Sequence, residues 1–348
     1  EWLDSFEKIN ICFDSDKAGQ DAAVAVAELF DPRKVRLVKM TLNDPNEYIN
    51  HGREREFIDS HRKAGPFTPD GILAGNELYD LVSTPPNYDS VAYPFFGLNK
   101  MTKGLRTGEL VTFVAGTGVG KTQVMRELLY HLIQEDKGSV GTLFLEEPVR
   151  DTGLGMMSIH ADKMLHLPDT QYTKEEFDDA YNATLGSNRV YLYDSFGSNS
   201  VERIVSMVRY LARSCDCKYI ILDHISIVVS DHAKDERKAL DEIATKLKTL
   251  TIELDICLLM VSHLNRDKNR KPPEEGGTIN LQDIRGTAGI GQLSNMIIAL
   301  ERNTQAEDEL ERNTTKVRVI KNRFTGETGV ADSLLYSRHT GRLTSYEG

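Results

Sequence analysis

The sequence lacks a run of apolar residues long enough to cross a lipid bilayer, which takes about 20 such residues in a helix. A membrane-spanning helix is therefore not expected, and we expect a cytosolic protein. Cysteine is also scarce: the chain has four, and none forms the paired C-x-x-C spacing of a structural zinc site. We therefore favour buried free thiols over a cysteine-bound metal.

Positive charge is in deficit, because the 348 residues carry a formal net charge of −11. This balance argues against a broad nucleic-acid-binding surface, although a local one depends only on where the charges lie. Hydrophobic residues make up 40% of the chain and charged residues 27%, as in ordinary globular proteins of one large or two smaller domains. The chain starts without a methionine, so we expect a piece of a longer protein.

The most informative stretch is an apolar segment, 110–115, that ends in a glycine-rich turn and then a helical pattern from Thr122. Glycines let backbone N–H groups converge on phosphates, Lys121 reaches the outer ones, and the Thr122 hydroxyl can ligate Mg²⁺. Ala115 stands where this pattern usually has its first glycine. The alternative is a glycine-rich turn that does not bind phosphate. The predicted phosphate-binding residues are Gly116, Thr117, Gly118, Val119, Gly120, Lys121 and Thr122.

Polar residues follow several other apolar runs. Asp223 ends the run 219–222, where a Mg²⁺-orienting acid is expected in such nucleotide sites. Glu146 and Glu147 follow the run 140–145, and His263 follows the run 256–261. Continuous rather than alternating apolar runs predict a parallel sheet that is covered on both faces. The fold class is therefore predicted to be α/β.

The amino-terminal part has its own strand and helix pattern. Asp14 and Asp16 follow a short apolar strand, and they are equally compatible with a divalent-cation site and with an acidic turn that caps the next helix. Residues 65–94 are rich in Pro and Gly with one short helical segment, which predicts a linker before a domain that begins at residue 95. The acidic stretch 150–188 gives no clear element.

Two loops have a composition that suits contact with a phosphate chain. Lys268, Arg270 and Lys271 lie in a basic stretch of this acidic protein, and Arg285, Gly286 and Gly289 lie in a glycine-rich one. Backbone amides with a few cations can follow a nucleic-acid backbone without reading its bases. For the basic stretch alone, a solvated loop is the favoured alternative.

Several segments together resemble the motif set of ring helicases of superfamily 4, and most closely that of the bifunctional primase-helicases of T-seven-type short-tailed phages. Bacterial DnaB and mitochondrial Twinkle are more distant relatives. The segments are Ala115 to Thr122, Leu145 to Glu147, Ile221 to His224, Ser262 to Leu264, Asp283 to Gly289, and Lys321 to Gly326.

The resemblance implies a RecA-like P-loop NTPase core with a mainly parallel sheet, preceded by a partial TOPRIM segment. Its domains would be a TOPRIM segment at 1–64, a linker at 65–94 and a helicase domain at 95–348. Asp14 and Asp16 would be vestigial TOPRIM metal ligands. The TOPRIM glutamate would precede Glu1, so primer synthesis is not expected.

The function implied is an NTP-dependent replicative DNA helicase that moves along single-stranded DNA as a ring, most plausibly a hexamer. ATP or dTTP would be the substrate and Mg²⁺ the cofactor. Forked duplex DNA and a replicative DNA polymerase would be its partners, in the cytoplasm of the host cell if the chain is viral.

Roles in hydrolysis also follow from the resemblance. Lys121 would hold the β/γ-phosphates, and Thr122 and Asp223 the Mg²⁺. Glu146 would polarise the attacking water, with Glu147 as an adjacent competitor.

Further roles concern the γ-phosphate, the base and DNA. His263 would sense the γ-phosphate, and Arg323 would be an arginine finger from the neighbouring subunit. Arg302 and Tyr336 would sandwich the base. The residues of the two loops would line the central channel, but the loop after His263 departs from the family in length and cation placement. Residues 158–163 also depart from it, and no roles transfer there.

Two other functions share the phosphate-binding pattern. A RecA-like recombinase would be a DNA-dependent ATPase that forms open filaments rather than rings. A nucleotide-gated DNA-binding or assembly module would bind nucleotide without hydrolysing it, and the joint presence of Lys121, Glu146, Asp223 and Arg323 argues against that class.

Overall fold

The computed structural model describes residues 2–68, 75–84, 90–135, 137–194, 200–225, 236–265, 271–284 and 288–346. The chain divides into two compact units, Glu1–Asn87 and Tyr88–Gly348, which we describe separately. The domain boundaries at 64/65 and 94/95 stay a prediction. No helix among the described residues is long and apolar enough to cross a membrane.

The amino-terminal unit is a small α/β layer around a sheet in the order β1-β2-β3. The first two strands are parallel and the third is antiparallel to β2. Ile9, Ile11, Val35 and Phe67 form its core with Ala27. The strands are β1 (Ile9–Ile11), β2 (Val35–Leu37) and β3 (Gly65–Pro66), and the helices are η1 (Leu3–Ser5), α1 (Lys17–Ala27), α2 (Pro45–Asn50), α3 (Glu54–Arg62), η2 (Gly75–Glu77) and α4 (Tyr79–Ser83).

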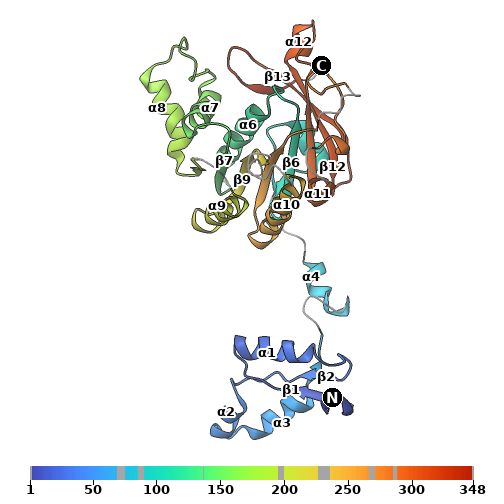
Figure 1. Ribbon diagram of the computed structural model, residues 1–348. Helices are drawn as coiled ribbons and strands as arrows, with labels where there is room; N and C mark the ends of the chain where they lie inside the picture. The colour runs from blue at the N-terminus through green and yellow to red at the C-terminus, as the bar shows by residue number, and fades with distance from the viewer. Residues whose placement is uncertain are drawn as a thin grey trace. The chain divides into compact units, whose positions relative to one another are not determined.

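The larger unit is built on one sheet, in which the described residues form nine strands in the order β14-β13-β12-β11-β6-β10-β9-β7-β8 (Figure 1). The strands from β11 to β8 in this order are parallel, and β12 to β14 are added to the β11 edge as antiparallel strands. Their bounds are β6 (Leu110–Ala115), β7 (Ser139–Phe144), β8 (Val190–Leu192), β9 (Cys217–Asp223), β10 (Cys257–Ser262), β11 (Met296–Glu301), β12 (Thr314–Asn322), β13 (Gly329–Tyr336) and β14 (Leu343–Ser345). A separate small sheet joins β4 (Ser90–Val91) to β5 (Leu105–Arg106).

Helices cover both faces of this sheet, so its central strands are buried on both sides. One core forms under α5, α6 and α7, and the other under α9, α10 and α11. The helices are α5 (Phe96–Thr102), α6 (Lys121–Gln134), α7 (Val149–Ala161), α8 (Lys174–Ala183), η3 (Leu185–Ser187), α9 (Val201–Ser214), α10 (Glu236–Glu253), η5 (Leu281–Asp283), α11 (Ala288–Leu293) and α12 (Glu309–Asn313).

The continuous apolar runs of the sequence form the buried centre of the sheet. All residues of β6, β10 and β11 are buried, as expected of parallel strands that lie between two helical layers. The predicted α/β fold with a mainly parallel sheet is therefore confirmed. Because β6, β7, β9 and β10 are parallel neighbours, the residues that follow them meet at one edge of the sheet.

The stretch 150–188, which had no predicted element, contains α7 and α8. Gly155 of α7 faces the Arg126 side chain of α6 so closely that a Cβ atom there would lie 2.5 Å from Arg126 Nε. The glycine therefore lets the two helices pack together.

Candidate functional site

The phosphate-binding loop joins β6 to α6 and is shaped by glycines with positive φ. Gly118 has φ +75° and Gly120, the N-cap of α6, has φ +100°, values that residues with a Cβ rarely adopt. The loop therefore leads directly into the amino end of a 14-residue helix, where the helix dipole favours an anion.

Lys121 is the first residue of α6, and its side chain contacts backbone oxygens at the start of the loop. Its Nζ donates to the Gly116 carbonyl at 3.1 Å and lies 3.5 Å from the Ala115 carbonyl. Burial lowers the pKa of Lys121, and the carboxylates of Asp223, Glu146 and Glu274 act in the opposite direction. The ammonium group is therefore poorly solvated, which suits a group that binds phosphate.

Thr122 and Asp223, the two predicted Mg²⁺ ligands, are in direct contact. The Thr122 Oγ1 donates to Asp223 Oδ2 at 3.0 Å. Asp223 is only 4% exposed, and its Oδ1 is buried with no hydrogen-bond partner among the described residues. Burial raises the pKa of this carboxyl group. An orphaned carboxylate oxygen beside a threonine hydroxyl fits the oxygen ligands that Mg²⁺ takes, so the residues present suit this ion.

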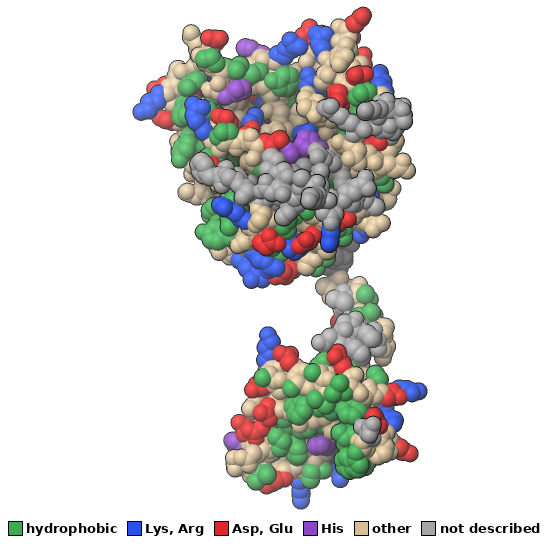
Figure 2. Space-filling model, viewed as in Figure 1, with side chains coloured by type: hydrophobic (Ala, Val, Ile, Leu, Met, Phe, Trp, Pro, Cys, Tyr) green, Lys and Arg blue, Asp and Glu red, His purple; other side chains and the backbone are tan. Residues whose placement is uncertain are grey.

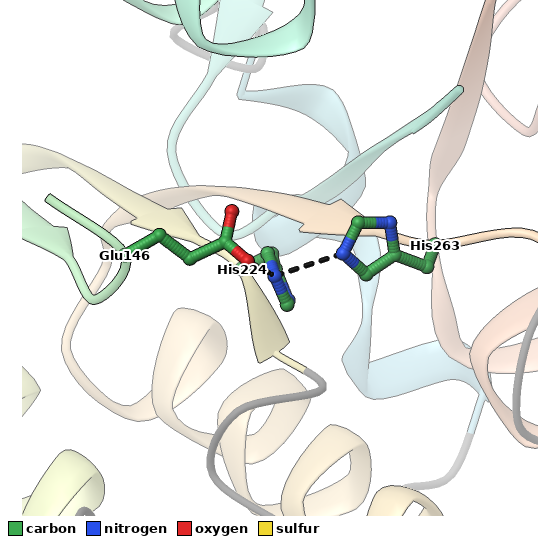
Figure 3. Close-up of side chains that lie close together, drawn as sticks. All are labelled: Glu146, His224 and His263. Carbon is green, nitrogen blue, oxygen red and sulfur yellow. Dashed lines mark hydrogen bonds and ion pairs between the residues drawn. The ribbon is translucent and has the colours of Figure 1, made fainter. Parts of the chain in front are cut away.

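Glu146 lies in a cluster with two histidines at the same sheet edge (Figure 3). It follows β7, whereas His224 and His263 follow the neighbouring strands β9 and β10. Glu146 Oε1 contacts His224 Nε2, and the Nε2 atoms of the two rings are 2.8 Å apart. His263 Nδ1 lies 3.3 Å from Lys121 Nζ. A continuous polar chain thus links Glu146 to the phosphate-binding lysine.

Glu147 points to a different set of partners. Its carboxylate accepts hydrogen bonds from Arg126 at 2.7 Å and from the Thr152 hydroxyl at 2.7 Å. Glu146 is therefore the acidic residue that contacts the histidine cluster, and Glu147 ties β7 to α6 and α7. In the face seen in Figure 2, histidine, acidic and basic side chains lie together in the middle of the larger unit.

Arg302 and Tyr336 are neighbours at the sheet edge where the parallel strands end. The guanidinium carbon of Arg302 lies 5.8 Å from the centre of the Tyr336 ring, and its Nε donates to the Arg312 carbonyl at 2.7 Å. Arg302 directly follows β11, and Tyr336 ends β13. Both are level with the phosphate-binding loop, because Leu300 of β11 pairs with Ala115 of β6.

Arg323 lies at the opposite edge of the sheet. The preceding residue, Asn322, pairs with Met296, which pairs with Val111 near the start of β6. From Val111 to the end of β6 at Ala115 is a distance of about 13 Å at the usual rise of a strand. Arg323 is exposed, and its guanidinium donates to the Gln292 carbonyl at the end of α11. It is therefore remote from the phosphate-binding loop of its own chain.

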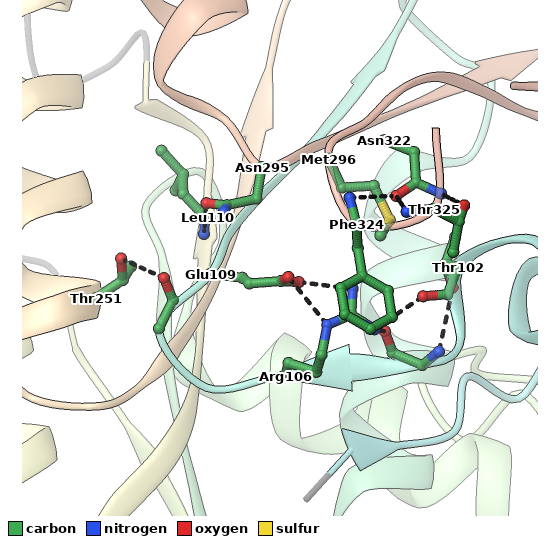
Figure 4. A network of polar contacts seen from close by, with 12 residues as sticks. Thr102, Arg106, Glu109, Leu110, Thr251, Asn295, Met296, Asn322, Phe324 and Thr325 are labelled. Atoms are coloured by element: carbon green, nitrogen blue, oxygen red, sulfur yellow. Dashed lines mark hydrogen bonds and ion pairs between the residues drawn. The ribbon is translucent and has the colours of Figure 1, made fainter. Parts of the chain in front are cut away.

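The turn that carries Arg323 is fixed by a buried polar network (Figure 4). The Arg106 guanidinium donates to both oxygens of Glu109, at 3.0 and 3.1 Å, and lies 3.8 Å from the centre of the Phe324 ring. Thr325 Oγ1 donates to the Met101 carbonyl at 2.8 Å. These contacts hold the two residues that follow Arg323.

The remaining predicted site residues are placed as follows. Lys268, Arg270, Arg285 and Gly286 lie outside the described residues. Lys271 is exposed, and Gly289 lies within α11.

In the amino-terminal unit, Asp16 caps α1, since its side chain accepts from the Gly19 backbone N–H at 2.7 Å. A metal role for Asp14 and Asp16 stays a prediction.

Sequence reasoning assigned no role to His224 or Arg126. His224 directly follows the predicted Asp223, so the sequence alone places it at the carboxyl end of the same strand. Its contact with His263 depends on the pairing of β9 with β10, which the sequence does not reveal.

Two family models match the chain. The DnaB-like helicase C terminal domain matches residues 90–345, and a Toprim-like model matches residues 1–49. Among curated proteins, a DNA helicase/primase of Enterobacteria phage T3 is 35% identical over 359 residues, covering 100% of this chain and 63% of the relative. A replicative DNA helicase DnaB of Helicobacter pylori is 24% identical over 215 residues, covering 60% of this chain and 43% of the relative. The chain thus spans less than two thirds of these relatives.

Solved structures show a similar fold. One, described as a DnaB-like replicative helicase and its interactions with primase, superposes with a TM-score of 0.65 at 19% identity over 94% of this chain and 76% of the other. A KaiC-like protein of Pyrococcus horikoshii gives a TM-score of 0.51 at 17% identity over 75% of this chain and 100% of the other. The predicted RecA-like core is confirmed by this likeness and by the sheet order. The chain belongs to the family of proteins with a DnaB-like helicase C terminal domain.

Proposed function

We propose that this chain is the motor of a replicative DNA helicase that hydrolyses NTP and moves along single-stranded DNA as a hexameric ring. The observation that carries the proposal is the separation of two half-sites. Lys121, Asp223 and Glu146 meet at one sheet edge, and Arg323 is exposed at the other. The family match over residues 90–345 and the names of the relatives support the same function.

In the proposed site, each residue has one task. Lys121 binds the β/γ-phosphates, and Thr122 with Asp223 holds Mg²⁺, which supplies positive charge to the phosphates when bound. Glu146 accepts a proton from the attacking water, and His263, which reaches both Lys121 and His224, senses the γ-phosphate. Arg302 and Tyr336 hold the base.

The second half-site comes from a neighbouring subunit. Arg323 would contribute a cation to the neighbour's nucleotide, and such a finger in GTPases is worth about 10³–10⁵ in rate. The turn that carries it is already fixed by Arg106 and Phe324, so little ordering is needed on docking. Lys268, Arg270, Lys271, Arg285, Gly286 and Gly289 are proposed to line the channel that holds single-stranded DNA.

The proposal is tested by unwinding of a forked DNA duplex with ATP, dTTP and the other NTPs in turn, with hydrolysis measured with and without single-stranded DNA. We expect strand separation and DNA-stimulated hydrolysis, both lost in Lys121→Ala. Hydrolysis without strand separation, together with open filaments in negative-stain images, would support a recombinase instead. Nucleotide binding without hydrolysis would overturn the assignment as an enzyme.

A further inference from the structure

Glu146, His224 and His263 form a cluster whose residue types are those of a zinc site. This holds independently of the proposed nucleotide site beside it. We propose that these three side chains bind a borderline divalent cation of the zinc class when no nucleotide is bound. One ligand atom from each residue lies within 4.8 Å of the others. Two imidazoles and one carboxylate are a ligand set that zinc takes, and it is distinct from the oxygen ligands that suit Mg²⁺ at Thr122 and Asp223.

The backbone holds the three ligands in place. Each residue follows a strand of one parallel sheet, and β9 lies between β7 and β10 in that sheet. His224 is 3% exposed, so its ring is fixed by packing, whereas the Glu146 side chain is 51% exposed and opens the cluster to solvent. A cation therefore has one ligand fixed by packing, His224, and an entry path beside Glu146.

The distance between the two imidazole nitrogens needs only a small adjustment. Tetrahedral zinc with bonds of about 2.0–2.1 Å places two nitrogen ligands roughly 3.3 Å apart. The two Nε2 atoms are 2.8 Å apart, so the rings would separate by about 0.5 Å, which small side-chain rotations supply. Solvent would occupy the fourth position.

The Nε2 atom of His224 has two polar neighbours. A carboxylate only accepts, and an imidazole Nε2 carries at most one proton. His224 Nε2 faces both Glu146 and His263, so a single N–H must serve two acceptors or meet a second donor. A cation at the centre would accept a lone pair from every atom. When His224 Nε2 binds a cation, the ring proton lies on Nδ1, which is buried and has no partner among the described residues.

One neighbouring charge opposes binding. Lys121 Nζ lies 3.3 Å from His263 Nδ1, the nitrogen that would carry the proton in a metal-bound ring. The same ammonium also contacts the Gly116 carbonyl, so it can withdraw from the ring without losing all its partners. Lys121→Met should therefore bind the cation more tightly than the wild type.

Cobalt spectroscopy tests the site independently of hydrolysis. Co²⁺ is added to chelator-treated, nucleotide-free protein, and the visible absorption typical of tetrahedral Co²⁺ is followed, with Zn²⁺ as the displacing ion. We expect one equivalent to bind, the signal to be lost in His224→Ala and in His263→Ala, and the affinity to rise in Lys121→Met. His160→Ala is the matched control, because His160 also pairs with a carboxylate, Asp179, at 3.0 Å but lies outside the cluster.

Folding of the variants is checked separately, and His224→Gln and His263→Gln repeat the experiment with side chains that keep hydrogen bonding. An unchanged signal in folded His224 and His263 variants, or a signal lost equally in His160→Ala, would overturn the proposal. So would weak absorption typical of octahedral Co²⁺.

If the proposed role of Glu146 is right, Zn²⁺ should also inhibit NTP hydrolysis, because it would hold Glu146 and His263 away from the nucleotide. This second measurement rests on the proposed function, whereas cobalt binding does not. Cobalt binding with no inhibition would therefore count against the role of Glu146 and leave the metal site standing. Inhibition with no cobalt binding at the cluster would overturn the site.

Discussion

The buried carboxylate of Asp223 is costly to the protein when no ligand is bound. Its Oδ1 has lost water and gained no partner among the described residues, and only Thr122 donates to Oδ2. Leaving a buried acceptor unsatisfied costs about 1–3 kcal/mol. We therefore expect the proposed cation ligand Asp223 to lower the stability of the protein when no cation is bound.

Asp223→Asn should therefore stabilise the ligand-free protein and abolish its response to Mg²⁺. We expect a rise in Tm of about 2–4 °C without nucleotide. Because burial raises the pKa of Asp223 above its ordinary 3.8, the unfolded state binds fewer protons than the folded state between these two values. The stability of the wild type therefore falls as pH rises from 3.8 through the raised pKa of Asp223. The Tm difference between Asp223→Asn and the wild type should be largest above that pKa and should vanish below pH 3.8. Calorimetric melts at several pH values measure this, and an equal or lower Tm for the variant at neutral pH would contradict it.

Substitution of Glu146 should affect the rate of hydrolysis, whereas substitution of Glu147 should affect thermal stability. Glu146→Gln should keep nucleotide binding and lose about 10²–10⁴ in turnover, the usual contribution of a general base. Glu147→Gln should mainly lower Tm, because Arg126 is largely buried and its Nε has no partner among the described residues. Steady-state hydrolysis and thermal melts of both variants decide the matter. Loss of turnover in the Glu147 variant alone would exchange the two roles.

At the scale of elements, the turn after β12 acts as a mount for Arg323. Phe324 stacks on Arg106, which is itself bound to Glu109 and to the Thr102 carbonyl at 2.8 Å. The ring is 41% exposed, so it contributes more to the shape of the turn than to the hydrophobic core.

Phe324→Ala should reduce hydrolysis by about tenfold or more, because even an error of 1 Å in the placement of a catalytic group is costly. Nucleotide binding should be little changed. Phe324→Tyr keeps the ring over Arg106 and should restore most of the rate. Turnover and nucleotide affinity of both variants provide the measurement, and full activity of the alanine variant would show that the stacking does not position Arg323.

The elements that the sequence predicted well are those governed by local pattern. The apolar run of β6, the glycines of the loop and the acid that ends β9 were all visible in the residue order. The helix α7 was not, because Gly153 and Gly155 lower its helix propensity. Those glycines are explained only by close neighbours, Leu185 and Arg126, that belong to other elements.

The candidate site shows the same division. Residues at the ends of strands were predicted one by one, but the contact between His224 and His263 depends on the sheet order, in which β10 lies between β6 and β9. Likewise, the choice between Glu146 and Glu147 depends on Arg126, which donates a hydrogen bond to Glu147. Such long-range pairings are not encoded in local periodicity.

At the scale of the whole molecule, the two proposed half-sites lie on opposite edges of one sheet, so the proposal predicts that a complete site requires two subunits. Mixing two inactive variants tests this. Lys121→Ala keeps an intact Arg323 and Arg323→Ala keeps an intact Lys121, so some interfaces in mixed assemblies should contain both. We expect hydrolysis to return, up to about one quarter of the wild-type rate if subunits mix at random and interfaces act independently.

The matched control is a mixture of Lys121→Ala with Glu146→Gln. Both changes damage the same half-site, so no interface in this mixture is complete, and activity should stay absent. Recovery in this control, or no recovery in the first mixture, would contradict a site shared between subunits.

In the proposed assembly, each subunit also has a direction, because one edge accepts the arginine of a neighbour and the other edge supplies Arg323. In an open row of subunits, the first and last members each keep an unused half, so the row has one site fewer than it has subunits. Only in a closed ring does the number of complete sites equal the number of subunits. The number of active sites per assembly therefore measures directly whether the ring is closed.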